Sequence, residues 1–136
     1  MHLNRDEFGS WLVRYVEAWR SGDAAIIGDL FSADATYDYR VGSRVVMGRD
    51  AIVAAWLAED ETTAWDAHYE PLAIDDEVHV SIGWSRYFDD SGALRDEYSN
   101  IFLCRFDEDG RCREFTEWWM RAPNDGPLAR LGDESA

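Results

Sequence analysis

The feature that most constrains the fold is a change in hydrophobic periodicity near Thr62 and Thr63. Before this point, apolar residues recur at steps of three and four, which is typical of amphipathic helices. After it, apolar and polar residues alternate, as they do in strands with one buried face. Helices followed by strands predict an α+β fold rather than alternating α/β units. With 136 residues, the chain has room for one such domain and not for a second.

The first half of the chain predicts three helices. The first begins at an Asn4 cap, with Glu7 as its reciprocal partner, and ends at Gly22. Its apolar face consists of Phe8, Trp11, Leu12, Tyr15, Val16 and Trp19. Asp23 caps a shorter second helix, and the motif Gly48-Arg49-Asp50 opens a third. We expect these two helices to bury Ile26, Ile27, Leu30 and Phe31, and Ile52, Ala55 and Trp56, respectively.

The rest of the chain predicts five strands, of which the last four form an antiparallel meander. A first strand at about 35–41 ends at the Gly42-Ser43 turn, and four further strands cover about 65–74, 78–88, 94–106 and 111–121. Within 94–106, apolar residues occupy both phases, with Tyr98 and Phe102 in one and Ile101 and Leu103 in the other. A strand of this kind is covered on both faces, so we expect a homodimer to bury the outer face. The domain is predicted to span 1–122, and 123–136 form a polar C-terminal tail.

Charge and motifs exclude several classes of function. A formal net charge of −15 disfavours nucleic-acid and anionic-membrane partners. No run reaches the roughly 20 apolar residues of a membrane span, and no signal peptide is recognised. Cys104 and Cys112 make no disulfide framework, so we expect a cytoplasmic, reduced protein. Metal-ligand spacings and phosphate-binding loops are missing, and we expect no metal and no cofactor.

Several short motifs resemble one family. The segment Arg14–Ala18 with Ser21-Gly22-Asp23 resembles the first helix of ketosteroid isomerases, and the segments 31–36 and 41–43 continue the match. Gly48-Arg49-Asp50-Ala51-Ile52 is similar to the helix-opening motif of the nuclear transport factor 2-like superfamily, which includes SnoaL-like polyketide cyclases. The segment 105–111 resembles the last hairpin of that group, so the resemblance extends nearly to Arg121.

The resemblance implies a cone: a strongly curved mixed or antiparallel sheet around three helices from the N-terminal half, with an internal pocket. The tyrosine that stabilises the oxyanion in ketosteroid isomerases falls on Tyr15. The general-base position of those enzymes falls on Tyr39, and their protonated aspartate on Phe102. Asp38, beside the lost base, points the other way unless a bulge intervenes. Standard steroid isomerase activity is therefore not expected.

Strand phase predicts the site. Asn100 and Phe102 share one face of their strand, and Glu117 and Trp119 share one face of the last strand. Together with the resemblance, this predicts one cavity lined by Tyr15, Tyr39, Trp56, Asn100, Phe102, Glu117 and Trp119. A Glu117 carboxyl buried there has a raised pKa, whereas a register shifted by one residue leaves it solvated. His79 lies opposite the apolar row Val78, Val80 and Ile82, and we expect it to be exposed or at the dimer face.

Three functional classes remain open. The first is a cofactor-independent isomerase, cyclase or dehydratase that moves a proton on a small hydrophobic carbonyl compound. There Tyr15 polarises an oxygen, and Glu117 or Asp38 is the base. The second is a protein that binds such a ligand without changing it, and the third is a dimeric interaction module. An acid and a hydroxyl that face one another in the pocket favour the first.

Overall fold

The computed structural model describes residues 2–40, 44–59 and 64–123. Its helices are α1 (Arg5–Ser21), α2 (Ala24–Gly28) and α3 (Arg49–Ala58). Its strands are β1 (Phe31–Tyr39), β2 (Arg44–Met47), β3 (Trp65–Asp75), β4 (Val78–Phe88), β5 (Leu94–Phe106) and β6 (Cys112–Arg121). The predicted α+β fold is confirmed. The predicted Gly42-Ser43 turn, the Thr62-Thr63 boundary and the tail beyond Pro123 lie outside the described residues.

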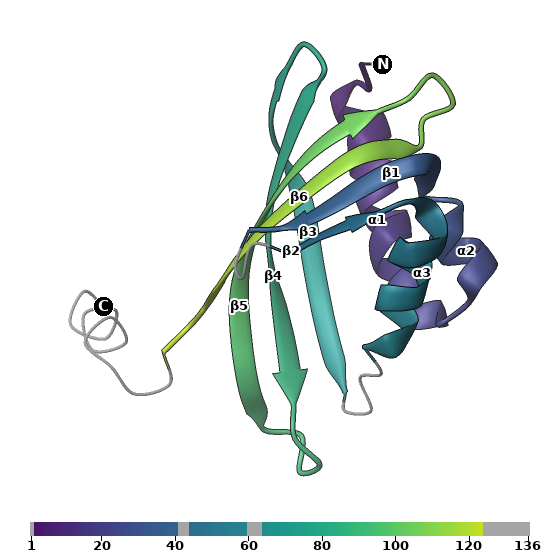
Figure 1. Cartoon of the computed structure of the whole chain (residues 1–136). Coiled ribbons are helices and arrows are strands. Elements are labelled where there is room, and N and C mark those ends of the chain that lie inside the picture. Colours follow the sequence, from purple (N-terminus) through teal and green to yellow (C-terminus); the bar gives the residue numbers. More distant parts are fainter. Residues whose placement is uncertain (1, 41–43, 60–63, 124–136) are drawn as a thin grey trace.

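The strands form one sheet in the order β2-β1-β6-β5-β4-β3. β1 pairs with β6 in parallel, and the other neighbours are antiparallel, so the sheet is mixed. Register shifts in four of the five strand pairs help to bend it. The helices all lie on one side of the curved sheet (Figure 1). This is the cone that the resemblance implies.

Two details near the N-terminal half differ from the prediction. The short strand β2 was not predicted, because its four residues give too brief a pattern to be recognised. Phe31 begins β1 instead of extending the second helix, which ends at Gly28. Ile26, expected on the inner face of that helix, is 50% exposed, because a helix of five residues can bury only part of its surface.

Helix α1 forms as the sequence predicts. Asn4 accepts a hydrogen bond from the Glu7 backbone while the Glu7 side chain accepts one from the Asn4 backbone, which completes the capping box. Gly22 takes the left-handed conformation, with φ of 60°, and so ends the helix. The buried face of α1 carries Tyr15 into the interior, where its ring stacks on Phe115 of β6.

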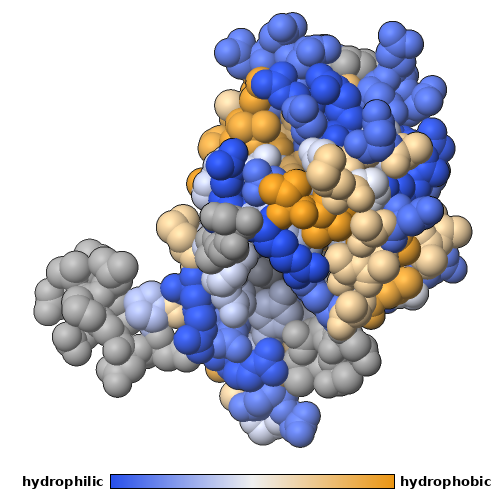
Figure 2. Space-filling view, in the orientation of Figure 1, coloured by the Kyte–Doolittle hydropathy of each residue, from blue (hydrophilic) through white to orange (hydrophobic). Residues whose placement is uncertain are grey.

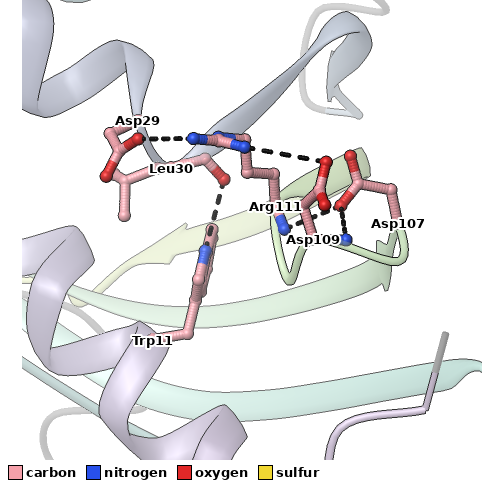
Figure 3. Close-up of polar contacts among 6 residues, drawn as sticks. All are labelled: Trp11, Asp29, Leu30, Asp107, Asp109 and Arg111. Atoms are coloured by element: carbon pink, nitrogen blue, oxygen red, sulfur yellow. Dashed lines mark hydrogen bonds and ion pairs between the residues drawn. The ribbon is translucent and has the colours of Figure 1, made fainter.

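Arg111 links the turn between β5 and β6 to the end of α2 (Figure 3). The Arg111 guanidinium bonds Asp29, beyond α2, at 2.9 Å. In the turn between β5 and β6, the Asp107 carboxylate accepts bonds from the backbone N–H groups of Asp109 and Arg111. These contacts hold the β5–β6 turn against the chain that leads into β1. Asn100 and Glu117 lie farther from this turn, near the middle of β5 and β6.

The prediction for His79 is wrong. Its side chain is fully buried, and it packs edge-on against Phe8 and Phe106. Its Nε2 lies 3.0 Å from the Leu3 backbone N–H, and its Nδ1 lies 2.9 Å from the Glu77 carbonyl oxygen. Val78, Val80 and Ile82 alternate with His79 along β4, and the prediction placed these apolar residues on the buried face. They lie instead on the outer face of the sheet, which is itself partly apolar. Cys104 and Cys112, also fully buried, are free cysteines.

The outer face of the sheet carries a row of apolar side chains across three neighbouring strands. Ile82 of β4 pairs with Ile101 of β5, which pairs with Trp118 of β6. Ile82 is 39% exposed and Trp118 36% exposed. Beside them, the Arg86 guanidinium lies over the Trp84 ring at 4.0 Å.

Among the described residues, no helix is both long and apolar enough to cross a membrane.

Candidate functional site

A cavity of about 510 Å³ opens between the helices and the concave face of the sheet. Nine of its fifteen lining residues are tyrosine or tryptophan. The polar remainder consists of Arg44, Glu59, Ser85, Arg95, Asn100 and Glu117. Figure 2 shows a hollow in this face of the molecule that is bordered by residues of intermediate and low hydropathy. A volume of this size suits a small organic molecule, since ligand pockets span roughly 300–1,000 Å³.

Most of the predicted site residues surround this cavity. Six of them come from five different elements of the fold and meet in one lining: Tyr15, Tyr39, Trp56, Asn100, Glu117 and Trp119. The alternative register, which leaves Glu117 solvated, is therefore wrong. Asp38 and Phe102 do not belong to the lining.

Asp38 lies on the opposite face of β1. Tyr37 and Tyr39 pair with Phe115 and Glu117 of β6 without an intervening register shift, so the side chain between them points outward. The Asp38 carboxylate instead lies 3.3 Å from the Arg40 guanidinium. Because no bulge turns it inward, Asp38 is not placed to act as the base.

Phe102 faces inward but lies too deep. It is fully buried, and its ring packs against Tyr15, Tyr69 and Phe115 at centroid distances of 4.5 to 5.3 Å. Strand phase gives the face of a residue and not its depth along the cone, so the prediction placed Phe102 on the cavity wall. Its observed role is to support the rings of Tyr15 and Tyr69 from below.

A chain of hydroxyl groups leads to the carboxylate of Glu117. The hydroxyls of Tyr15 and Tyr37 lie 2.8 Å apart. Tyr37 donates its proton to Glu117 Oε2 at 3.3 Å. Since each hydroxyl has one proton, Tyr15 is then the donor to Tyr37. The acid and hydroxyl that favour proton-transfer chemistry therefore face one another inside the cavity.

A second set of polar groups approaches Glu117 from the other side. Ser85 donates to Asn100 Oδ1 at 3.1 Å, which turns the Asn100 amide nitrogen toward its hydrogen-bond partner Glu117. Tyr69 in turn hydrogen-bonds Ser85. We call the continuous set Tyr15, Tyr37, Glu117, Asn100, Ser85 and Tyr69 the polar belt. Helix α1 and the strands β1, β6, β5, β4 and β3 each supply one of its members.

Burial raises the pKa of Glu117 to about 7. Removal from water is the main cause, and the charge of Glu59 adds to it. The hydrogen bonds from Tyr37 and Asn100 act in the opposite direction, because they stabilise the ionised carboxylate. A carboxyl group balanced in this way can accept and release a proton near neutral pH.

Four tyrosines of the cavity have raised pKa values and remain protonated under the same conditions. Burial and the negative charge of Glu117 raise the pKa values of Tyr15 and Tyr37 well above their usual range. Burial raises the pKa of Tyr39 and Tyr69 as well. The cavity therefore presents several hydroxyl donors beside the Glu117 carboxyl group. Donors of this kind stabilise negative charge on a bound oxygen.

Sequence reasoning missed several of these residues. Tyr37 shares the inward phase of Tyr39 and lies two positions before it, so alternation alone was a signal that could have found it. Ser85 and Tyr69 also follow the inward phase of their strands, but serine and tyrosine give little functional signal by themselves. Among the parts of the chain that the structure describes, no group of three or more metal-ligating side chains is found.

The same fold occurs in solved structures. A protein of unknown function from Burkholderia xenovorans LB400, described as NTF-2 like, superposes with a TM-score of 0.67 at 14% identity, covering 93% of this chain and 92% of that one. A putative ketosteroid isomerase from Kribbella flavida DSM 17836 gives 0.65 at 12% identity, covering 90% and 84%. A domain of unknown function with a cystatin-like fold from Nostoc punctiforme PCC 73102 gives 0.67 at 13%, covering 96% and 85%.

Sequence comparison gives the family. No curated protein matches the chain by sequence. The family model of the SnoaL-like domain matches residues 12–115, from the middle of α1 into the first part of β6. The match includes every member of the polar belt except Glu117. Fold, element order and family model agree. The chain therefore belongs to the SnoaL-like domain family, within the nuclear transport factor 2-like superfamily.

Proposed function

We propose that the protein binds a small, largely hydrophobic carbonyl compound in its cavity and catalyses a proton transfer on it, as an isomerase, cyclase or dehydratase does. The single observation that carries the proposal is the Glu117 carboxyl, which lies in the aromatic cavity between two hydrogen-bond donors. A role in packing alone does not account for an ionisable carboxyl group at that position, because the burial of such a group costs free energy.

The roles follow from the hydrogen bonds. In its ionised form, Glu117 removes a proton from the carbon next to the substrate carbonyl, and the electron pair moves onto the carbonyl oxygen. Tyr37 donates to Glu117 in the resting site. Once Glu117 is protonated, the Tyr37 hydroxyl is released to donate to the enolate oxygen, and Tyr15 supports it from 2.8 Å away. Return of the proton to the same or another carbon completes the exchange or the isomerisation.

The test is deuterium exchange. A panel of cyclic and aryl ketones is incubated with the protein in D₂O, and mass spectrometry measures deuterium at the carbons next to the carbonyl. We expect accelerated exchange with at least one ketone, at a rate that rises with pH and levels off above an apparent pKa of about 7. The control is Glu114→Gln, which changes a half-exposed glutamate of the same strand that pairs with Arg105 at 3.0 Å.

Two results would contradict the proposal. One is exchange no faster than in protein-free buffer for every ketone that binds. The other is exchange that survives unchanged in Glu117→Gln. Binding without exchange would leave the alternative function, that of a protein which holds its ligand unchanged.

The proposal extends to the oligomeric state, which we infer to be a homodimer. The apolar row Ile82, Ile101 and Trp118 lies on the outer face, and β5 carries apolar side chains in both phases. Burial of that row between two copies removes apolar surface from water. Light scattering at micromolar concentration should give the mass of a dimer. Trp118→Arg should give a monomer, whereas Ile26→Arg, on exposed helix α2, should stay dimeric; a monomeric unmodified protein would overturn the inference.

A further inference from the structure

The cavity lining has a different balance of positive and negative residues from the chain as a whole. The lining contains two arginines, Arg44 and Arg95, and two glutamates, Glu59 and Glu117. Formal charges therefore balance there, whereas the chain as a whole carries −15. The pKa values of both glutamates are raised, in each case chiefly by burial. Near neutral pH, partial protonation of Glu117, whose pKa is about 7, moves the balance inside the cavity toward positive charge.

Each arginine rests on an aromatic wall of the cavity. The Arg44 guanidinium carbon lies 5.5 Å from the centroid of the Tyr39 ring. The Arg95 guanidinium carbon lies 5.8 Å from the centroid of the Tyr87 ring. Contacts of this kind orient a guanidinium group and reduce the freedom it loses when it binds a ligand. Arg44 comes from β2, at one edge of the sheet, and Arg95 from the start of β5.

Arg95 also has a protein partner, which does not prevent a second role. Its Nε donates to Asp96 at 2.9 Å. The same Asp96 carboxylate accepts from Arg121 at 2.8 Å, so it is stabilised by two arginines. A guanidinium has five N–H donors in a planar fork and commonly serves two acceptors at once. The Arg95 side chain is 43% exposed, and a ligand in the cavity can reach it.

We propose that the cavity selects hydrophobic ligands that carry an anionic group, such as a carboxylate, which the guanidinium groups of Arg44 and Arg95 bind. The aromatic part of the ligand then fills the hollow beneath, and its carbonyl group lies toward the polar belt. The inference deepens the proposed function and rests on it for one point, that this cavity is the ligand site. It adds a substrate class: an acidic, largely apolar carbonyl compound instead of a neutral one.

The experiment compares two fluorescent probes that differ only in charge. 8-Anilinonaphthalene-1-sulfonate carries one sulfonate, and N-phenyl-1-naphthylamine has the same rings without it. We expect the anionic probe to bind more tightly at low salt, and its affinity to fall as salt is raised. Arg44→Gln and Arg95→Gln should each weaken the anionic probe about tenfold or more, as expected for a charge-assisted hydrogen bond, and leave the neutral probe unchanged.

Two control variants separate the outcomes. Arg86→Gln removes a guanidinium from beside Trp84 on the outer face, so loss of the anionic probe there, with no loss in the cavity variants, would overturn the inference. Equal affinity for the two probes, or no binding of either, would also overturn it. Glu117→Gln should keep both probes bound while it loses deuterium exchange. Failure of this inference is thereby distinguished from failure of the proposed function.

Discussion

Glu117→Gln is expected to reduce deuterium exchange by roughly 10²–10⁴-fold, the usual contribution of a general base, and to make the protein more stable above neutral pH. Glutamine keeps the shape of the side chain and can still accept the hydrogen bond from Tyr37. It removes the group that titrates. One substitution should therefore change function and stability in opposite directions.

The direction of the stability effect follows from the raised pKa. Glu117 has a pKa of about 7 in the folded chain and an ordinary value of 4.5, so the folded state binds the proton more tightly. The stability that this proton supplies is complete below about pH 4.5 and is lost as the pH rises through 7. The loss amounts to about 3 kcal/mol, since each pKa unit corresponds to about 1.4 kcal/mol.

Urea denaturation at several pH values measures this effect. Relative to the unmodified protein, Glu117→Gln should gain about 2 to 3 kcal/mol between pH 5 and pH 8. Glu114→Gln, on the same strand but half-exposed, should show no such change. A Glu117→Gln curve parallel to that of the unmodified protein across this range would mean that the Glu117 carboxyl titrates as it does in water.

Gly83→Ala is expected to destabilise the protein by about 3 kcal/mol or more, at the upper end of the cost of overpacking a core. Gly83 of β4 pairs with Tyr69 of β3, and a Cβ atom there would lie 2.1 Å from the His68 carbonyl oxygen. It would also lie 2.5 Å from the Tyr69 ring. Because the first of these neighbours is backbone, β3 itself must move.

The matched control is the same substitution at Gly9 in α1. A Cβ atom at that position meets only the Pro71 ring, at 3.7 Å, which is an ordinary contact. Alanine stabilises a helix interior by about 0.5–1 kcal/mol relative to glycine, so Gly9→Ala should be neutral or stabilising. Thermal denaturation of both variants measures the difference. Equal stability of the two would show that β3 and β4 are not in such close contact at Gly83.

The sequence predicted the parts of the fold that depend on periodicity. The apolar face of α1, the long strands and the inward phase of Asn100 and Glu117 follow from the spacing of apolar residues, which long segments repeat often enough to be recognised. The ends of α1 follow from its capping residues. β2 repeats its pattern over only four residues and was missed. The parallel pairing of β1 with β6 joins distant segments, and no local pattern specifies it.

The candidate site shows the same limit. Phase correctly brought Glu117 and Trp119 to the cavity, but it gave no depth, so Phe102 was placed on the wall instead of beneath it. His79 was misplaced because its apolar neighbours were assigned to the core, while they belong to the outer face. Tyr37 was missed for a different reason: the resemblance points to Tyr39 and does not single out Tyr37, which lies two positions earlier on the same face of β1.

The polar belt can form only when nearly all elements of the fold are in place. Its members lie far apart in the chain, as the bond between Tyr37 and Glu117 shows by joining residues 80 positions apart. An intermediate that lacks α1, β1 or any of the strands β3 to β6 therefore cannot contain the complete belt. Contacts of such long sequence separation form late and slow the folding of a domain. Recovery of deuterium exchange after dilution from denaturant should then follow the slowest step that completes the sheet, and no partial activity should precede it.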